Sequence, residues 1–149
     1  MMDLQKLRNT KAKILLLGSH PGIIQSILDF DYLAEKKEPS IKVILAGGRQ
    51  YERYFFGKKE IVIPVFSSFE KIPSKLREDI TFFLNVTSGR RVLPSSLEAI
   101  ENLPSLMGGV VFAEDVPEVH AIELRQKAEQ KKKFILGPAS VGLLLPNTL

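Results

Sequence analysis

The chain of 149 residues has the length of one domain, and no apolar run approaches the roughly 20 residues of a membrane-spanning helix. The absence of cysteine excludes a disulfide framework, a thiolate metal site and a cysteine nucleophile. The net charge of +4 favours anionic partners, but the lysines are scattered, so we expect no nucleic-acid partner. Two isolated histidines, His20 and His120, predict no metal site. The cytoplasm is the simplest location, and no membrane partner is expected.

Short apolar runs alternate with amphipathic segments along the chain. The runs predict six strands: Lys13–Leu17, Ile41–Ala46, Ile61–Val65, Thr81–Val86, Gly109–Ala113 and Lys133–Leu136. The amphipathic segments predict four helices: Pro21–Glu35, Phe69–Glu78, Pro94–Leu103 and Pro117–Lys132. No helical pattern separates the second strand from the third, so a long irregular loop is expected there. The alternation predicts a single α/β domain, a Rossmann-like parallel sheet with helices on both faces.

Ligands of such a sheet bind outside the carboxyl ends of its strands. Six loops are therefore candidates for a binding site, and four of them contain glycine. They are Gly18–Gly22, Gly47–Gly57, Pro64–Ser68, Thr87–Arg91, Glu114–Pro117 and Gly137–Gly142. Glycine together with serine, threonine, asparagine and arginine suits a polar, phosphate-bearing ligand.

The first loop reads Gly18-Ser19-His20-Pro21-Gly22 and departs from the dinucleotide fingerprint G-x-G-x-x-G. A glycine after the strand, followed by the N–H groups of a helix start, still fits an anion site. A plain strand–helix turn is an equally good interpretation of this loop alone.

The second strand ends at Gly47-Gly48-Arg49, where an NAD-binding domain would carry a carboxylate for the ribose hydroxyls. Arginine at this position suits a ribose that carries a phosphate, as in NADP or the adenosine end of coenzyme A (CoA). A solvated loop arginine is the alternative.

Polar groups also follow the fourth and fifth predicted strands. The segment Asn85–Arg91 holds two arginines that could clamp a carboxylate or phosphate, unless Ser88 only caps a turn and the arginines face water. After the fifth strand, stabilisation of the helix dipole is the better explanation for the acidic residues Asp115 and Glu118 in a first helical turn. For Glu114, a structural and a functional role both remain open. His120 lies inside a predicted helix, where a surface position is expected.

Taken together, these segments resemble the CoA-binding domain of ATP-citrate lyase and citryl-CoA synthetase and, more distantly, the α subunit of succinyl-CoA synthetase. The likeness rests on LDFDY followed by EPS, FFGKKEIVIPVF, FLNVTS, and AEDVPE with ILGPASVG. These segments lie in Leu28–Ser40, Phe55–Phe66, Phe83–Ser88, Ala113–Glu118 and Ile135–Gly142, and the resemblance covers nearly all of the chain.

The resemblance implies a CoA site lined by the opening loop (Gly18, Ser19, His20, Gly22), the second-strand loop (Gly47, Gly48, Arg49) and the IPVF segment (Pro64, Val65, Phe66). It implies that Asn85, Val86, Thr87 and Ser88 face citrate and the acyl thioester. It also implies a catalytic role for Glu114, near the phosphohistidine of the family. In that family ATP, used with magnesium, phosphorylates a histidine, the phosphoryl group is passed on to activate citrate, and the CoA thiol captures the activated citrate as citryl-CoA.

Two departures from the family pattern concern the site. The family's EGIP reads EDVP here, so that Asp115 adds a charge, and its NFAS reads NVTS. Neither histidine lies in the context of the phosphohistidine. The chain is therefore expected to be a fragment or one piece of a longer subunit, which needs an ATP-grasp domain or subunit and is not catalytically complete alone.

Two other functions remain open from the sequence. A stand-alone sensor that binds CoA or NADP without chemistry would explain the missing phosphohistidine. An NADP-dependent reductase is the weakest alternative, because the fingerprint glycines are absent.

Overall fold

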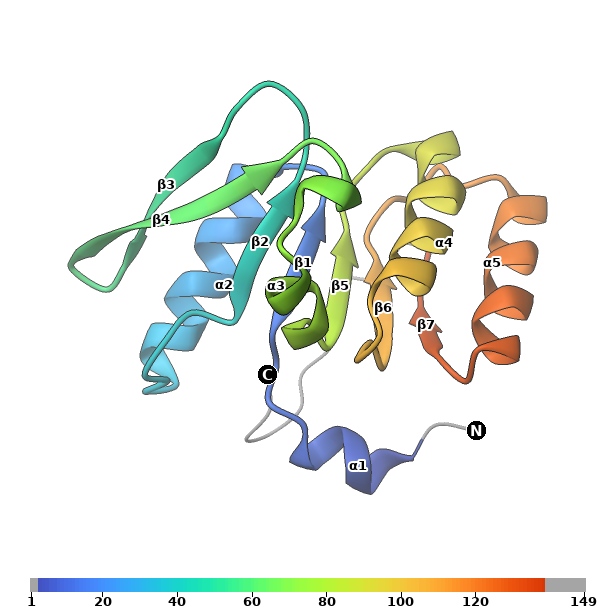
Figure 1. The fold of residues 1–149 in the computed structure, drawn as a ribbon, viewed down its shortest axis with the longest axis horizontal. Coiled ribbons are helices and arrows are strands. Elements are labelled where there is room, and N and C mark those ends of the chain that lie inside the picture. Colours follow the sequence, from blue (N-terminus) through green and yellow to red (C-terminus); the bar gives the residue numbers. More distant parts are fainter. Residues whose placement is uncertain (1–2, 139–149) are drawn as a thin grey trace.

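The computed structural model describes residues 3–138, which form one seven-stranded sheet with helices on both faces (Figure 1). The strands are β1 (Ile14–Leu17), β2 (Ile41–Leu45), β3 (Tyr51–Phe56), β4 (Lys59–Phe66), β5 (Phe82–Asn85), β6 (Gly108–Val111) and β7 (Phe134–Leu136). The helices are α1 (Leu4–Asn9), α2 (Pro21–Leu33), α3 (Ser74–Asp79), α4 (Val92–Asn102) and α5 (Glu118–Gln130).

The sheet confirms the predicted Rossmann-like class. Its strand order is β3-β4-β2-β1-β5-β6-β7, and every pair is parallel except the antiparallel pair β3–β4. The chain moves outward from β1 in one direction through β2 and β4 and then in the other through β5, β6 and β7. The strand order thus reverses at β1, and the crevice at the carboxyl ends of β1 and β5 is where such sheets bind ligands.

Both faces of the sheet are buried, as the continuous apolar runs predicted. In β1, Leu15 and Leu17 belong to a core cluster with residues of α4 and α5, whereas Ile14 and Leu16 belong to a second cluster with residues of α1 and α2. Successive side chains of a strand point to opposite faces, so one apolar strand supplies both cores.

Two expectations about the elements are wrong, and one short helix was not predicted. The connection between β2 and β4 is not an irregular loop, because Tyr51–Phe56 forms the edge strand β3. The helix expected at Phe69–Glu78 is divided into a 3₁₀ turn, Phe69–Lys71, and α3. Pro73 lies between the two and keeps the preceding residue, Ile72, extended. The short helix α1 was not predicted, since Leu7 is its only buried residue.

A buried carboxylate ties the end of α2 to the start of β2. Asp31 is 1% exposed, and its Oδ2 accepts hydrogen bonds from the backbone N–H of Ser40 at 2.8 Å and from its hydroxyl at 2.6 Å. The ammonium of Lys36 lies 3.0 Å from Oδ1 of the same carboxylate. The LDFDY and EPS motifs therefore form a structural clamp between a helix and a strand.

The β3–β4 hairpin packs against α2 in two places. Its turn begins at Gly57, whose φ of +66° and close approach to the ring of Tyr32 leave no room for a Cβ atom. Along β3, the side-chain amide of Gln25 donates to the backbone carbonyl of Phe55 at 2.8 Å and accepts from its N–H at 3.1 Å. Tyr32 and Gln25 thus fix the hairpin over the helix.

The exposed carboxyl of Glu38 is expected to titrate far below its usual range. Hydrogen bonds from Lys11 and Lys42 and their charges lower the pKa of Glu38 from 4.5 to about 2. The lowered pKa means that this stabilisation is complete above pH 4.5 and is lost as the pH falls towards 2. Solvent screening keeps its contribution below about 1 kcal/mol, so the pKa itself is the better readout.

Proton NMR titration of the Glu38 carboxyl measures this pKa directly. Replacing both lysines, Lys11→Met with Lys42→Met, should return it towards 4.5, whereas the neighbouring Lys37→Met should leave it low. A Glu38 pKa near 4.5 in the unaltered chain would contradict the prediction.

Candidate functional site

A pocket lies at the carboxyl edge of the sheet, beside β1 and β2. Its volume is about 310 Å³. Its lining residues come from the loops after β1 and β2, from the first residue of α2 and from β3 and β4: Ser19, Pro21, Ala46, Gly47, Gly48, Arg49, Glu52 and Val65. Five of the predicted cofactor-binding residues, Ser19, Gly47, Gly48, Arg49 and Val65, are thus brought together.

The loop after β1 is held close to the loop after β5. Gly18 has a φ of +87°, and a Cβ atom on it would lie 3.0 Å from Cγ2 of Thr87. The Gly18 N–H donates to the carbonyl of Leu45 at 2.9 Å, so the backbone is also tied to β2. Glycine is required here for both its conformation and the close approach of Thr87.

The start of α2 offers fewer free donors than the sequence suggested. Pro21 has no N–H, and Nδ1 of His20 accepts the N–H of Ile23 at 3.2 Å as an N-cap. Of the first three helical residues, only Gly22 keeps an N–H without a partner in the described part of the chain. His20 therefore acts first as a helix cap, while Gly22 remains available to an anion.

The loop after β2 leaves space for a ligand. A Cβ atom on Gly47 or Gly48 would meet nothing within 4 Å, and Gly48 has a φ of +89°. Arg49 follows them, is exposed, lines the pocket and has no ion-pair partner among residues 3–138. Its guanidinium is free to meet an anion that enters over the two glycines.

A buried carboxylate that sequence reasoning missed forms the wall of the pocket. Glu52 on β3 is 9% exposed, and its two oxygens lie 2.6 and 3.0 Å from the hydroxyl of Ser19. Tyr54, two residues along the same face of β3, contacts the pair. Burial, followed by the charge of Glu52, raises the pKa of Tyr54, so its phenol stays protonated at neutral pH.

The strand β4 contributes only one of the three residues expected from it. Val65 lines the pocket and is buried in the core on the α2 side, whereas Phe66 packs against the opposite core. Pro64 pairs with Tyr51 on the antiparallel edge and does not line the pocket. Alternation along a strand cannot turn three consecutive side chains towards one ligand.

Asn85, at the end of β5, is fully buried and uses its whole amide inside the protein. Its Nδ2 donates to the hydroxyls of Ser95 and Ser96 at 2.9 and 2.8 Å. Its Oδ1 accepts from the N–H of Thr87 at 3.0 Å and from its hydroxyl at 2.6 Å. Asn85 therefore positions the loop after β5, where Val86 packs on the core and Ser88 is exposed.

The loops after β5 and β6 are joined by Asp115. Its Oδ1 accepts the N–H of Gly89 at 3.0 Å, and α5 begins only at Glu118, so the expected place of Asp115 in a first helical turn is wrong. Glu118 does lie in that turn. Glu114 is exposed beside the junction. His120 is half-buried rather than on the surface, with its Nδ1 buried.

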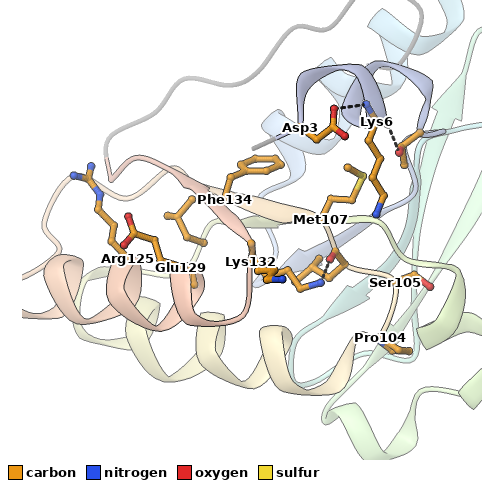
Figure 2. A pocket seen from close by; sticks show the side chains of 14 residues that line it. Asp3, Lys6, Pro104, Ser105, Met107, Arg125, Glu129, Lys132 and Phe134 are labelled. Carbon is orange, nitrogen blue, oxygen red and sulfur yellow. Dashed lines mark hydrogen bonds between the residues drawn. The ribbon is translucent and has the colours of Figure 1, made fainter. Parts of the chain in front are cut away.

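A larger hollow of about 940 Å³ lies at the other end of the sheet (Figure 2). Met107 and Phe134 line it at the amino ends of β6 and β7, and Lys6 and Arg125 line it from α1 and α5. Burial, followed by the charge of Lys6, lowers the pKa of Lys133 there. Because parallel sheets bind ligands at their carboxyl ends, the smaller pocket is the better candidate.

Two further observations concern residues 3–138 alone. They contain no group of three or more histidine, aspartate or glutamate side chains that could hold a metal ion. No helix among them is long and apolar enough to cross a membrane. Only Gly137 and Pro138 of the expected GPASVG loop belong to the described residues, and the part of the loop from position 139 onwards lies outside them.

The chain is similar in sequence and in fold to proteins that are already known. ATP-citrate synthase subunit 1 of Sordaria macrospora is 32% identical over 140 residues, which are 93% of this chain. The ATP-citrate synthase of Homo sapiens is 33% identical over 141 residues. The ATP citrate lyase of Methanothrix soehngenii, solved with citrate and coenzyme A, superposes with a TM-score of 0.80 at 30% identity over 89% of the chain.

The chain is a homologue of part of ATP-citrate synthase. The resemblance expected from the sequence is confirmed. The homologous region is a small part of these relatives: the chain spans 20% of the Sordaria subunit, 12% of the human enzyme and 21% of the Methanothrix lyase. No protein-family model matches the chain.

More distant neighbours share the fold alone. The homoserine dehydrogenase of S. aureus superposes with a TM-score of 0.62 at 17% identity over 87% of this chain. This likeness supports the Rossmann-like architecture of the ATP-citrate synthase homologue and carries no information about its ligand.

Proposed function

We propose that this chain is the CoA-binding domain of an ATP-dependent citrate-activating enzyme of the ATP-citrate lyase or citryl-CoA synthetase type. The proposal rests chiefly on the similarity to the Methanothrix enzyme, which was solved with citrate and coenzyme A. A lyase of Methanosaeta concilii that is also 30% identical was solved with (3S)-citryl-CoA. The pocket between the loops after β1 and β2 has the chemistry for the adenosine end of CoA.

In this proposal, Arg49 binds the ribose 3′-phosphate of CoA, because a guanidinium forms paired hydrogen bonds with phosphate. The N–H of Gly22 and the open backbone at Gly47 and Gly48 receive the pyrophosphate. Val65 forms an apolar wall. Pro64 and Phe66 flank Val65 on the same strand and do not line the pocket.

The citrate and thioester end of the ligand would lie along the loops after β5 and β6. Ser88 is exposed and its hydroxyl makes no capping bond, so it is free to bind a carboxylate. Asn85 acts through Thr87, which it holds in place. Glu114 stays the candidate for a catalytic group, because its exposed side chain lies at the same edge.

The rest of the reaction needs parts that this domain does not supply. An ATP-grasp domain or subunit would bind ATP and magnesium, and citrate would be bound in the complete enzyme. Alone, the chain should bind CoA and not turn over citrate. The cytoplasm, which also supplies CoA and ATP, is the location that fits this role.

Calorimetric titration with CoA, with NADPH and citrate in parallel, tests the function directly. Binding of CoA with no heat from NADPH supports the proposal. Binding of NADPH without CoA would reject it and leave the sensor or reductase alternatives.

Replacing Arg49 with alanine should weaken the affinity for CoA by about tenfold or more, since a phosphate–guanidinium contact contributes roughly 1.5–3 kcal/mol to binding. Dephospho-CoA lacks the 3′-phosphate and should bind both proteins alike. Arg53→Ala is the matched control, because this arginine lies on the same hairpin and is ion-paired with Glu60. Equal losses for CoA and dephospho-CoA would remove the phosphate role from Arg49.

A further inference from the structure

The pocket contains a charge that an anion-binding site does not need. Glu52 is buried at its wall while Arg49, three residues earlier, lies at its mouth. A carboxylate repels phosphate, and burying it is unfavourable unless it is hydrogen-bonded. Its position therefore points to a ligand with an anionic group near Arg49 and a neutral hydrogen-bond donor beside it.

The hydrogen bonds around Glu52 leave some lone-pair positions of its carboxylate free to accept a further hydrogen bond. The single hydrogen of the Ser19 hydroxyl is used on the carboxylate, at 2.6 Å from Oε1. A carboxylate has about four lone-pair positions, of which Ser19 and Tyr54 occupy only part. Glu52 and Ser19 thus present acceptor oxygens to the pocket, and a ligand hydroxyl is the group that would satisfy them.

We propose that Glu52 accepts a hydrogen bond from the free 2′-hydroxyl of a 3′-phosphoadenosine ligand and excludes ligands that carry a 2′-phosphate. The inference rests on the proposed function and assigns a specificity role within that site. The 2′-hydroxyl and the 3′-phosphate are neighbours on the ribose, as Glu52 and Arg49 are neighbours in the pocket. The pair therefore separates CoA from NADP, which bears its phosphate on the 2′-oxygen.

Three small ligands test the assignment on the unaltered 149-residue chain: adenosine 3′,5′-bisphosphate, its 2′-deoxy analogue and adenosine 2′,5′-bisphosphate. The first should bind about tenfold tighter than the other two, because a hydrogen bond to a charged group discriminates at that level. In Glu52→Gln the carboxylate charge is gone, so the preference over the 2′-phosphate should fall about tenfold. Glu60→Gln, on the exposed side of the hairpin, should keep the original preferences.

Equal binding of the 2′-deoxy analogue, or an unchanged preference in a folded Glu52→Gln variant, would overturn the assignment while CoA binding stands. Failure of CoA itself to bind the unaltered chain would reject the proposed function, and this inference with it. If Glu52→Gln does not fold, the relative affinities of the three ligands for the unaltered chain still test the assignment.

Discussion

Alanine in place of Asp31 should lower the free energy of unfolding by about 3 kcal/mol, because it leaves the buried N–H and hydroxyl of Ser40 without their acceptor and removes the carboxylate that pairs with the ammonium of Lys36. The clamp joins the end of α2 to β2, so its loss also frees a connection between two core elements. Urea unfolding at neutral pH, followed by circular dichroism, measures the difference.

Asp29→Ala is the matched control for Asp31. Asp29 lies on the same helix and is exposed, with one hydrogen bond to Gln25 at 2.8 Å. Its replacement should cost less than about 1 kcal/mol. Because Asp31 lies at the end of α2 away from the pocket, the CoA affinity of folded Asp31→Ala should be unchanged. A small stability loss, similar to that of Asp29→Ala, would show that the clamp is not needed.

The second large effect is expected for Asn85→Ala, with a loss of about 2–4 kcal/mol in the free energy of unfolding. The variant deprives the half-buried Thr87 of its acceptor and the fully buried Ser96 of its donor, and buried polar groups without partners are costly. The loop after β5 should also lose its fixed shape. Amide hydrogen exchange of Thr87 should therefore accelerate more than the global unfolding explains.

Asn102→Ala provides the comparison for Asn85. This amide donates to the carbonyl of Glu98 at 2.8 Å on the exposed side of α4, and its loss should change stability by less than about 1 kcal/mol. A similar small change for Asn85→Ala, with normal exchange at Thr87, would argue against the positioning role.

The parallel strands were predictable because strands buried on both faces appear as uninterrupted apolar runs. The edge strand β3 was not predicted, since YERYFF carries two charges and forms no such apolar run. The division of Phe69–Glu78 could have been anticipated from Pro73, which disfavours helix at the preceding residue. Termini of helices shifted by a few residues because capping decides them.

The candidate site was predictable where the chemistry lies in the loops themselves, as at Gly48 and Arg49. Glu52 was missed because its burial depends on the pairing of β3 with β4, which no local pattern reports. The spacing of Glu52 and Tyr54 on one face of an alternating segment was the available signal. Asn85 was interpreted as a substrate contact because the sequence does not reveal that two helix serines absorb its amide.

The two hydrogen bonds between Gln25 and the backbone of Phe55 have a consequence beyond holding the hairpin. β3 is an outer strand of the sheet, and outward-facing N–H and C=O groups on such a strand invite pairing with another chain. At Phe55 both groups are already occupied by one side chain from α2. An incoming strand would have to displace that amide first, so Gln25 disfavours aggregation by pairing of β3 with a strand of another chain.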